Sequence, residues 1–591
     1  MADSPSKNKD RVLTCFVYAN GKKLGDTYNL VSATVCLELN RIGRAMLKFN
    51  AGNQDKQTFD ESDENTFSPG SAIRLDAGDI NNQETIFDGI IVGLRIQTDS
   101  DFRSYMVLEC RDAAFAATQG RKNRIFEKKT DSEIINETLS SYGSVAVDST
   151  QYKHSSLVQY YCSDWDFALS RADACGLYIS CDGGKINIKK PKVDGSPVHT
   201  LTFGEDIIAF NLELSSDEQY SHYKAVSWSP DEQKMVATSA SNPKFNKQGD
   251  LNPDKIAVGN DMLLQTDAPT EDAALKQWAE SMALKAALAR YQGFVSFYGS
   301  SKVVPGCLIE LKGLGKRFNG NMFVGSVIHT IKNNEWVTEA GAGVSHINIT
   351  EEPDVMSPSA SGFLPGMQGL HSGIVRKLDG DPLNQYRVQV ELPWMDGQNK
   401  LLWVRLVSLY ATKESSIFFL PEIGDEVLVG FMNNDPSHPV ALGGFYSTKQ
   451  KPPYEFDAKN NKKAIVTRAK LSVEFDEEKK IITLKTPGGN TMELSDDGKC
   501  IHLADQHKNE ITMNDSGISL SSNKDIILKA KNSITMDATS KISITSKSDV
   551  GIDGMNANIQ AKVGATVKGN ATAELSASGQ TTVKGAMVMI N

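Results

Sequence analysis

Residues 518–552 read ISLSSNKDIILKAKNSITMDATSKISITSKSDVGI and place an apolar residue at every eighth position. Each has an apolar partner two positions later, and side chains at i and i+2 lie on the same face of a β-strand. After one step of seven residues the eight-residue period resumes at Ile559, Val567, Leu575 and Val583. The residues two positions before these are Ala557, Ala565, Ala573 and Thr581. We therefore predict nine octads, each one short strand and one corner. The predicted core consists of Ile518, Leu520, Ile526, Leu528, Ile534, Met536, Ile542, Ile544, Val550, Ile552, Ile559, Val567, Leu575 and Val583.

The opposite face of these strands carries Lys, Ser, Thr and Asp, so one side is dry and the other meets water. A fixed repeat of this kind is typical of a prism-like β-helix, and chance alternation in one exposed sheet is the alternative. One chain winding alone would form about three coils, a stub on the order of 15 Å high. Three interleaved chains would form a needle of roughly 43 Å without lateral edges. The pattern favours a homotrimer.

Composition excludes several classes of protein. At 591 residues the chain is too long for one core, and its net charge of −10 includes no basic stripe, so we expect no nucleic-acid partner. It has no apolar run of about 18 residues, and its start, MADSPSKNKDRVLTCF, lacks the apolar region of a secretory signal. We therefore expect synthesis in the bacterial cytoplasm without a signal peptide.

Alternating residues from 12 to about 120 predict a β meander, followed by helices at 131–143 and 163–176. DGG at 182–184 predicts a hairpin turn. A second β-rich block, 201–350, contains a helix whose predicted N-cap is Thr270. Five or so short strands in the next 80 residues, including SIFFLPEIGDEVLVGFM (416–432), predict a small closed barrel of the OB-fold type.

The two β-rich blocks repeat one pattern. PGSAIRL (69–75) followed by FDGIIVG (87–93) matches PGCLIEL (305–311) followed by FNGNMFVG (318–325). Each unit is a Pro-Gly turn, an alternating strand, a Gly turn and another strand. Convergent hairpin chemistry is one explanation and internal duplication is the one we favour. Two similar barrels in each of three chains would form a ring of six.

These segments resemble the VgrG spike proteins of type VI secretion and the related hub and spike proteins of contractile phage tails and extracellular injection particles. SDWDFALSRADACGLYI (163–179) resembles the helix-then-strand signature of the hub, and FNGNMFVGSVIHTIKNNEWVT (318–338) the closing hairpin of its second barrel. LPEIGDEVLVGFMNNDPSHPVALGGFY (420–446) resembles the OB core, and the octads resemble the intertwined β-prism. The resemblance covers nearly the whole chain.

The resemblance implies a mainly β homotrimer that caps a hexameric inner tube and contacts baseplate components through its hub. The expected parts are a first hub β-barrel at 1–125, a helical/β insertion at 126–200, a second hub barrel at 201–350, a linker at 351–366, an OB-fold at 367–447, a connector at 448–463 and a trimeric β-helix needle at 464–591.

The resemblance also implies a PAAR-repeat tip protein at the end of the needle. The apolar end TTVKGAMVMIN supports a flat docking platform made of Ala586, Met587, Val588, Met589, Ile590 and Asn591. A frayed end that closes the last coil is the alternative. Effector cargo and a transiently crossed target membrane are the other expected partners, and ejection would take the spike to extracellular space or a target cell.

No residue pattern predicts catalysis, a cofactor or a metal site. Asp164 and Asp166 lie early in a predicted helix, where carboxylates cap the helix and interact with its dipole. The pair His502 and His507 is interpreted as solvated. The eight cysteines lack zinc-ligand spacing, and we expect reduced, mostly buried thiols.

Two other functions remain open. A trimeric adhesin or tail fibre also uses a β-prism, but it would add a receptor-binding head and lack duplicated barrels. A polysaccharide-degrading enzyme on a β-helix would need paired carboxylates, and the octads carry only Asp537, Asp549, Asp553 and Glu574, spread without pairing. The sequence does not identify the machine (secretion system, released particle or phage tail), the target cell, the cargo or an ion at the tip.

Overall fold

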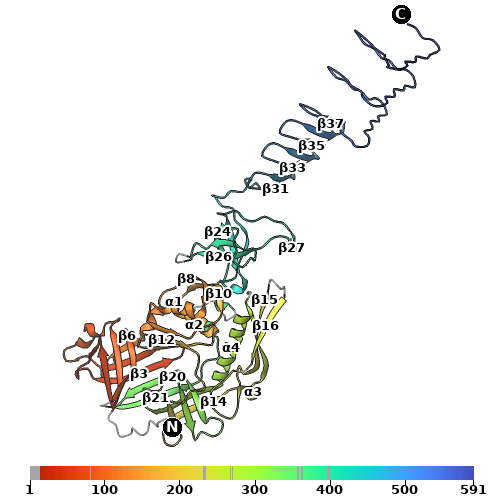
Figure 1. Cartoon of the computed structure of the whole chain (residues 1–591). Helices are drawn as coiled ribbons and strands as arrows, with labels where there is room; N and C mark the ends of the chain where they lie inside the picture. The colour runs from red at the N-terminus through yellow and green to blue at the C-terminus, as the bar shows by residue number, and fades with distance from the viewer. Residues whose placement is uncertain are drawn as a thin grey trace. The chain divides into compact units, whose positions relative to one another are not determined.

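The computed structural model describes residues 13–79, 82–229, 234–241, 243–266, 268, 270–355, 359–360, 364–395 and 399–590. The chain divides into two compact units, Met1–Pro452 and Pro453–Asn591, and each is described by itself (Figure 1). The first is built mainly of β-strands, as the sequence predicts, and the described strands of the second lie between Lys462 and Ser521.

One thirteen-stranded sheet dominates the first unit and joins strands from both repeated blocks. It is formed by β1 (Leu13–Ala19), β2 (Lys22–Lys23), β3 (Leu30–Glu38), β4 (Arg44–Asn50), β5 (Ala72–Asp79), β6 (Asn82–Thr98), β7 (Ser104–Arg111), β13 (His199–Thr202), β14 (Ile207–Leu214), β18 (Tyr291–Tyr298), β19 (Leu308–Lys312), β20 (Gly320–Lys332) and β21 (Glu335–Ala342). The two blocks meet where β20 pairs antiparallel with β3.

Each block arranges six strands in the same order. The first block has the order β3-β4-β7-β6-β5-β1, and the second has β14-β18-β21-β20-β19-β13. The first four of the five pairings are antiparallel in both blocks. The last pairing differs, because β1 runs antiparallel to β5 whereas β13 runs parallel to β19.

The Pro-Gly turns of the two blocks share their backbone geometry. Gly70 and Gly306 both have a positive φ, +96° and +91°, which favours glycine. Gly70 donates its N–H to the carbonyl of Ile91 and Gly306 donates to that of Val324, both at 2.7 Å. A β-bulge follows each acceptor, after Ile91 in β6 and after Val324 in β20. Shared order, turn and bulge support an internal duplication.

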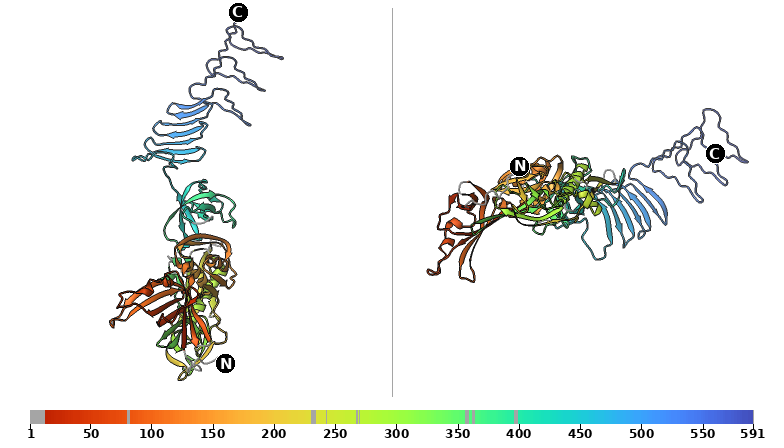
Figure 2. Two further views of the ribbon diagram at one scale, coloured as in Figure 1. Left: turned by 90° about the vertical axis from the view of Figure 1, so that its left-hand side faces the viewer. Right: turned by 90° about the horizontal axis from the view of Figure 1, so that it is seen from below.

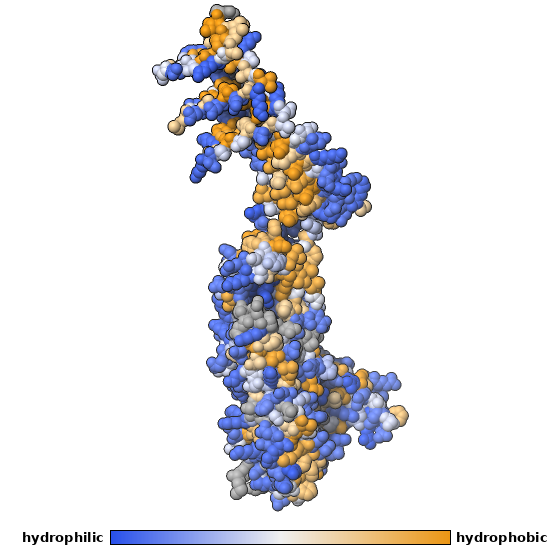
Figure 3. All heavy atoms as spheres, turned by 90° about the vertical axis from the view of Figure 1, so that its right-hand side faces the viewer, coloured by the Kyte–Doolittle hydropathy of each residue, from blue (hydrophilic) through white to orange (hydrophobic). Residues whose placement is uncertain are grey.

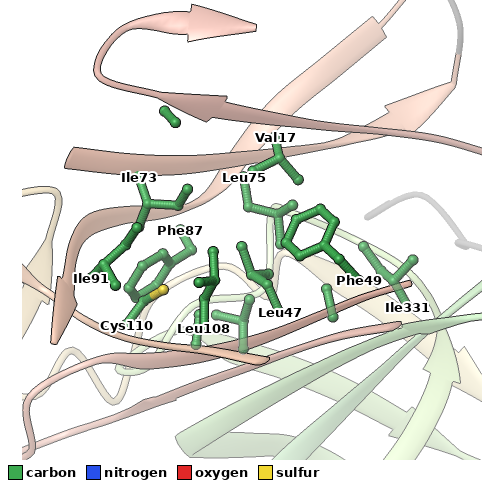
Figure 4. Packing of buried hydrophobic residues seen from close by; sticks show 14 of the residues in the cluster. Val17, Leu47, Phe49, Ile73, Leu75, Phe87, Ile91, Leu108, Cys110 and Ile331 are labelled. Atoms are coloured by element: carbon green, nitrogen blue, oxygen red, sulfur yellow. The ribbon is translucent and has the colours of Figure 1, made fainter. Parts of the chain in front are cut away.

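The core of the first block lies between strands of this sheet (Figure 4). Leu47, Phe49 and Leu108 are at most 1% exposed and pack with Leu75. Ile331 of β20 belongs to the same cluster, so the second block contributes to the core of the first.

A helical layer follows the first block. It contains β8 (Lys122–Thr130), α1 (Asp131–Leu139), β9 (Ser144–Val147), β10 (Lys153–Cys162), α2 (Asp164–Ala174), β11 (Tyr178–Asp182) and β12 (Lys185–Lys189). The predicted turn at 182–184 is confirmed, since it joins β11 to β12 with a positive φ at Gly183 and Gly184.

The remaining elements of the second block are β15 (Tyr220–Ser229), β16 (Lys234–Ser241), α3 (Pro253–Ile256), β17 (Gly259–Thr266) and α4 (Asp272–Ala289). The expected N-cap at Thr270 is wrong, because Glu271 occupies that position. The Thr270 hydroxyl donates to the carbonyl of Ala268 at 3.0 Å instead of accepting from the helix.

A buried ion cluster joins α1, α2 and β10. Asp131 is fully buried, with Arg171 Nε at 2.7 Å and His154 Nε2 at 3.0 Å from its two oxygens. Burial raises the pKa of Asp131, but the Arg171 guanidinium and the His154 ring outweigh it and hold the pKa below its usual range.

Five strands after position 370 close the predicted barrel: β24 (His371–Lys377), β25 (Val388–Glu391), β26 (Leu401–Leu406), β29 (Glu426–Phe431) and β30 (Pro439–Gly444). The prediction of a small closed barrel is confirmed. Of the segment 416–432, however, only 426–431 belongs to it. The short pair β22 (Ser359–Ala360) with β23 (Leu364–Pro365) precedes the barrel in sequence, and the pair β27 (Ala411–Thr412) with β28 (Ser415–Ser416) lies between β26 and β29. Residues 356–358 and 361–363 of the predicted linker lie outside the described residues, whereas Leu364 is buried.

The barrel packs on β10. Val158 belongs to the buried barrel cluster and donates its N–H to Ser437 Oγ at 3.3 Å. The Tyr160 ring lies 5.5 Å from that of Trp394 and 5.9 Å from that of His371. Aromatic edge contacts and apolar burial therefore fix the barrel to the rest of the first unit.

The second unit begins with one antiparallel sheet in sequence order (Figure 2). Its strands are β31 (Lys462–Val466), β32 (Ser472–Asp476), β33 (Ile481–Lys485), β34 (Thr491–Ser495), β35 (Cys500–Ala504), β36 (Glu510–Asn514) and β37 (Gly517–Ser521).

Asp131→Asn is expected to destabilise the first unit by about 3 to 5 kcal/mol, because it leaves Arg171 buried without its carboxylate. Since the folded pKa of Asp131 is lowered, its contribution is present above about pH 4 and is lost as pH falls further. Thermal unfolding at pH 7 and pH 3 measures both effects. Asp101→Asn, at a carboxylate that is 69% exposed, is the control, and equal losses for the two variants would contradict the assignment.

Candidate assembly surface

Two columns of apolar side chains run across the β31–β37 sheet on one face. Cross-strand register joins the first column through Ile465, Val473, Leu484, Met492, Leu503, Ile511 and Leu520. The second column runs through Phe475, Ile482, Leu494, Ile501, Met513 and Ile518. The needle predicted at 464–591 includes these strands, but the predicted core begins only at Ile518, although apolar residues at i and i+2 in the earlier strands carry the same signal.

This face is left uncovered within the chain. Ile482, Leu494 and Met513 are 37–39% exposed although they lie in the middle of the sheet. The opposite face carries Glu493, His502 and other polar residues in the alternate positions. Figure 3 shows hydrophobic residues gathered on one face of this region. A single sheet with one dry face needs a second apolar surface to bury it.

The two columns end where the predicted octads begin. Leu520 and Ile518 are both the last members of the columns and the first members of the octads. The described residues 522–590 contain no strand, and the chain turns back and forth along this stretch (Figure 1). All fourteen predicted core residues are 51–88% exposed, so the chain by itself does not bury them.

The predicted tip residues are also exposed. Met587, Val588, Met589 and Ile590 are 79%, 49%, 83% and 90% exposed, and Ala586 is exposed too. Asn591 lies outside the described residues.

The carboxylates of Asp164 and Asp166 make structural contacts. Asp164 accepts from Lys122 Nζ at 2.7 Å and from Tyr142 at 2.8 Å, which ties α2 to β8 rather than only capping a helix. Burial raises its pKa, but hydrogen bonds from Lys122, Gln159 and Tyr142 hold it below its usual range. The Ser163 hydroxyl accepts from the backbone N–H of Asp166 and donates to its carboxylate, as an N-cap should.

The cysteines are free thiols, but the expectation that most are buried is only partly right. Cys110, Cys162 and Cys175 are buried and the other five are partly buried, of which Cys15, Cys181 and Cys307 pack against apolar clusters. Burial raises the pKa of Cys110 and of Cys162 to about 12. Thiols with such pKa values are weak nucleophiles at neutral pH.

A polar cavity of about 520 Å³ lies between β3, α4 and the β20–β21 hairpin. Two of its cationic side chains are paired, since Lys285 Nζ lies 2.6 Å from Asp173 and Arg41 lies 3.3 Å from Glu352. Burial raises the pKa of Glu38. The two ion pairs tie α4 and the end of β3 to neighbouring segments.

Across the described ranges we find no group of three or more His, Cys, Asp or Glu side chains suited to a metal ion. In the same residues, no helix combines the length and the apolar character needed to cross a membrane.

Family models match most of the first unit. The Alg8 N-terminal domain matches residues 9–333, which is more than half of the chain. The type VI secretion system/phage-baseplate injector OB domain matches residues 371–446, which include the closed barrel. The chain belongs to the Alg8 N-terminal domain family and is a VgrG-type spike protein.

Curated relatives of this spike protein match over short segments. The type VI secretion system spike protein VgrG1a of Pseudomonas aeruginosa is 28% identical over 144 residues, or 22% of each chain. The actin cross-linking toxin VgrG1 of Vibrio cholerae is 30% identical over 95 residues, which are 15% of this chain and 9% of the toxin. The chain thus spans about a fifth or less of the length of these relatives.

The fold of the spike protein is also found in a solved structure. The Francisella PdpA–VgrG complex contains a chain with 12% identity and a TM-score of 0.50, covering 87% of this chain and 81% of that one. At this identity the likeness shows the fold alone.

Leu494→Lys in the spike protein is expected to weaken association between copies at least tenfold, because it would bury an unpaired ammonium in the second apolar column. Glu493→Lys changes the adjacent residue on the opposite face and is the matched control. Sedimentation equilibrium measures the association constant of both variants. Similar constants for the two would mean that the apolar face stays uncovered in solution.

Proposed function

We propose that the chain is the structural, membrane-puncturing spike of a contractile injection machine, and that it works as a homotrimer. The observation that carries the proposal is the pair of apolar columns that crosses the β31–β37 sheet and ends at Leu520 and Ile518, the first apolar pair of the predicted octads. Burying one large aliphatic side chain contributes about 1.5 to 3 kcal/mol, so fourteen exposed octad residues make a strong drive to associate.

Backbone hydrogen bonding favours interleaved chains in the octads. A coil wound by one chain alone would pair its own strands, and the described residues 522–590 contain no such pairing. Three interleaved chains would give each short segment neighbours on both sides and would leave no lateral edge. Residues 464–591 would then form a trimeric β-prism needle with its polar face outward.

The duplicated sheet supports a hub on a sixfold tube. Two six-stranded blocks of the same order in each of three chains would present six similar units around the axis. We place the first hub barrel at 1–125, the helical insertion at 126–200 and the second hub barrel at 201–350. The hexameric inner tube and baseplate components are the proposed partners of this hub.

The far end of the needle is the proposed platform for a PAAR-repeat tip protein or cargo. Met587, Met589 and Ile590 supply apolar side chains there. A likeness in fold to a chain of the Francisella PdpA–VgrG complex adds support for a partner bound to a spike of this kind.

The proposed role is mechanical rather than enzymatic. The acids and thiols described above serve structural contacts, and the driving energy would come from contraction elsewhere in the machine. We propose synthesis in the cytoplasm, assembly into a tail-like particle and ejection toward a target cell.

The solution mass tests the trimer. We expect 193.5 kDa, three times the 64.5 kDa of the chain, and a much smaller fraction of trimer when residues 464–591 are removed. Light scattering coupled to size-exclusion chromatography makes the measurement. A monodisperse monomer of the full chain would refute the proposed spike.

Deletions test the octad period. Removing residues 534–541 takes out one octad and keeps the phase of the columns, so the trimer should persist with a similar melting temperature. Removing residues 534–537 shifts every later corner by half a period and should lower the melting temperature of the assembled needle. Equal melting temperatures for the two deletions would contradict an octad-based prism.

A further inference from the structure

The OB domain carries an exposed apolar surface that its own barrel does not use. The segment between β26 and β29, residues 408–420, stands out from the barrel as a loop around β27 and β28 (Figure 1), and we call it the OB arm. Its exposed large side chains are Leu409 at 96%, Tyr410 at 54%, Ile417 at 47%, Phe418 at 76%, Phe419 at 63% and Leu420 at 42%.

The OB arm is an ordered hairpin. Ile417 donates its N–H to the carbonyl of Tyr410 at 3.0 Å. The Ser408 hydroxyl lies 3.0 Å from the Tyr410 carbonyl and 3.1 Å from the Ile417 carbonyl. These bonds cross-link the two sides of the hairpin, so the apolar residues are presented on a formed structure.

The base of the OB arm borders a second exposed apolar patch. Val407 donates its N–H to the carbonyl of Ala441, beside Leu442 of β30. Leu442 and Leu370 are 47% and 58% exposed, and both have side-chain atoms within 4 Å of the place where a Cβ at Gly430 would lie. Arm and patch therefore adjoin.

The size of this surface fits a stable protein interface. A fully buried aromatic side chain removes about 150–250 Å² of surface from water. Scaled by their exposed fractions, the six large side chains of the OB arm present roughly 700 Å² of accessible surface. A stable interface needs about 800 Å² on each partner, and the patch at Leu370 and Leu442 supplies the difference. Lys413 and Glu414 carry opposite charges at the turn of the arm, so its surface has no net charge to attract an ionic partner.

We propose that the OB arm and its adjoining patch pack against the OB domain of a second copy of this chain. This proposal rests on the proposed homotrimer. The OB domain is tethered to the second unit by residues 447–461, so needle assembly would hold three OB domains at high effective concentration. An asymmetric contact repeated by a threefold rotation closes after three copies and buries the arm of each.

A photo-cross-linking experiment in the full chain tests this contact. The residue p-benzoyl-phenylalanine replaces Phe418 in one sample and Phe102 in another, because both side chains are 76% exposed and only Phe418 lies on the OB arm. Chains labelled with ¹⁵N are mixed with unlabelled chains before assembly, and mass spectrometry then separates cross-links between copies from those within one copy. We expect the probe at position 418 to join residues 371–446 of another copy and the probe at 102 not to do so.

The solution mass of the same samples separates this inference from the proposed function. Suppose that the chain is a trimer, but the probe at 418 cross-links only within its own chain, to a different protein or to no protein. That result would overturn the OB contact and leave the proposed needle unaffected. A monomer would refute both. As a second measurement, Phe418→Asp should raise the dissociation constant of the trimer at least tenfold, whereas Phe102→Asp should leave that constant unchanged. No change with Phe418→Asp would also count against the contact.

Discussion

The need to bury two apolar columns is the constraint on which the second unit depends. Successive strands from β31 to β37 pair within the chain, but the sheet keeps one apolar face open to water. The described residues 522–590 form no strand pairing. Association with further chains would satisfy both the open apolar face and the unpaired backbone. Chains placed against the columns would bury the apolar side chains and hydrogen-bond to the backbone at the same time.

The first unit, by contrast, is stabilised by contacts within the chain. Its two blocks repeat one strand order, and the antiparallel pairing of β20 with β3 makes them one sheet. Ile331 extends from the second block into the core of the first, so the two blocks stabilise each other. The reversed direction of β13 relative to β1 makes the blocks similar rather than identical, so six of them would form only a pseudo-sixfold ring.

Features that leave a local sequence pattern were predictable, and features that join distant residues were not. The paired Pro-Gly turns and the closed barrel each leave such a pattern, and the turn at Gly70 has the backbone geometry of that at Gly306. The cluster of Asp131 with Arg171 joins residues 40 positions apart, and no local pattern marks it. The OB arm was misassigned because IFFL has the composition of a buried strand, whereas Phe418 and Phe419 are exposed.

The position of the columns along the chain has a consequence for biosynthesis. The octads follow the first unit in sequence, so they leave the ribosome after its sheet and barrel have emerged. A nascent chain at that stage has folded blocks and an open, aggregation-prone apolar strip at the same time. For the proposed trimer, neighbouring ribosomes on one messenger RNA would keep three such strips close together, which would favour assembly during translation over assembly from a diluted pool of single chains.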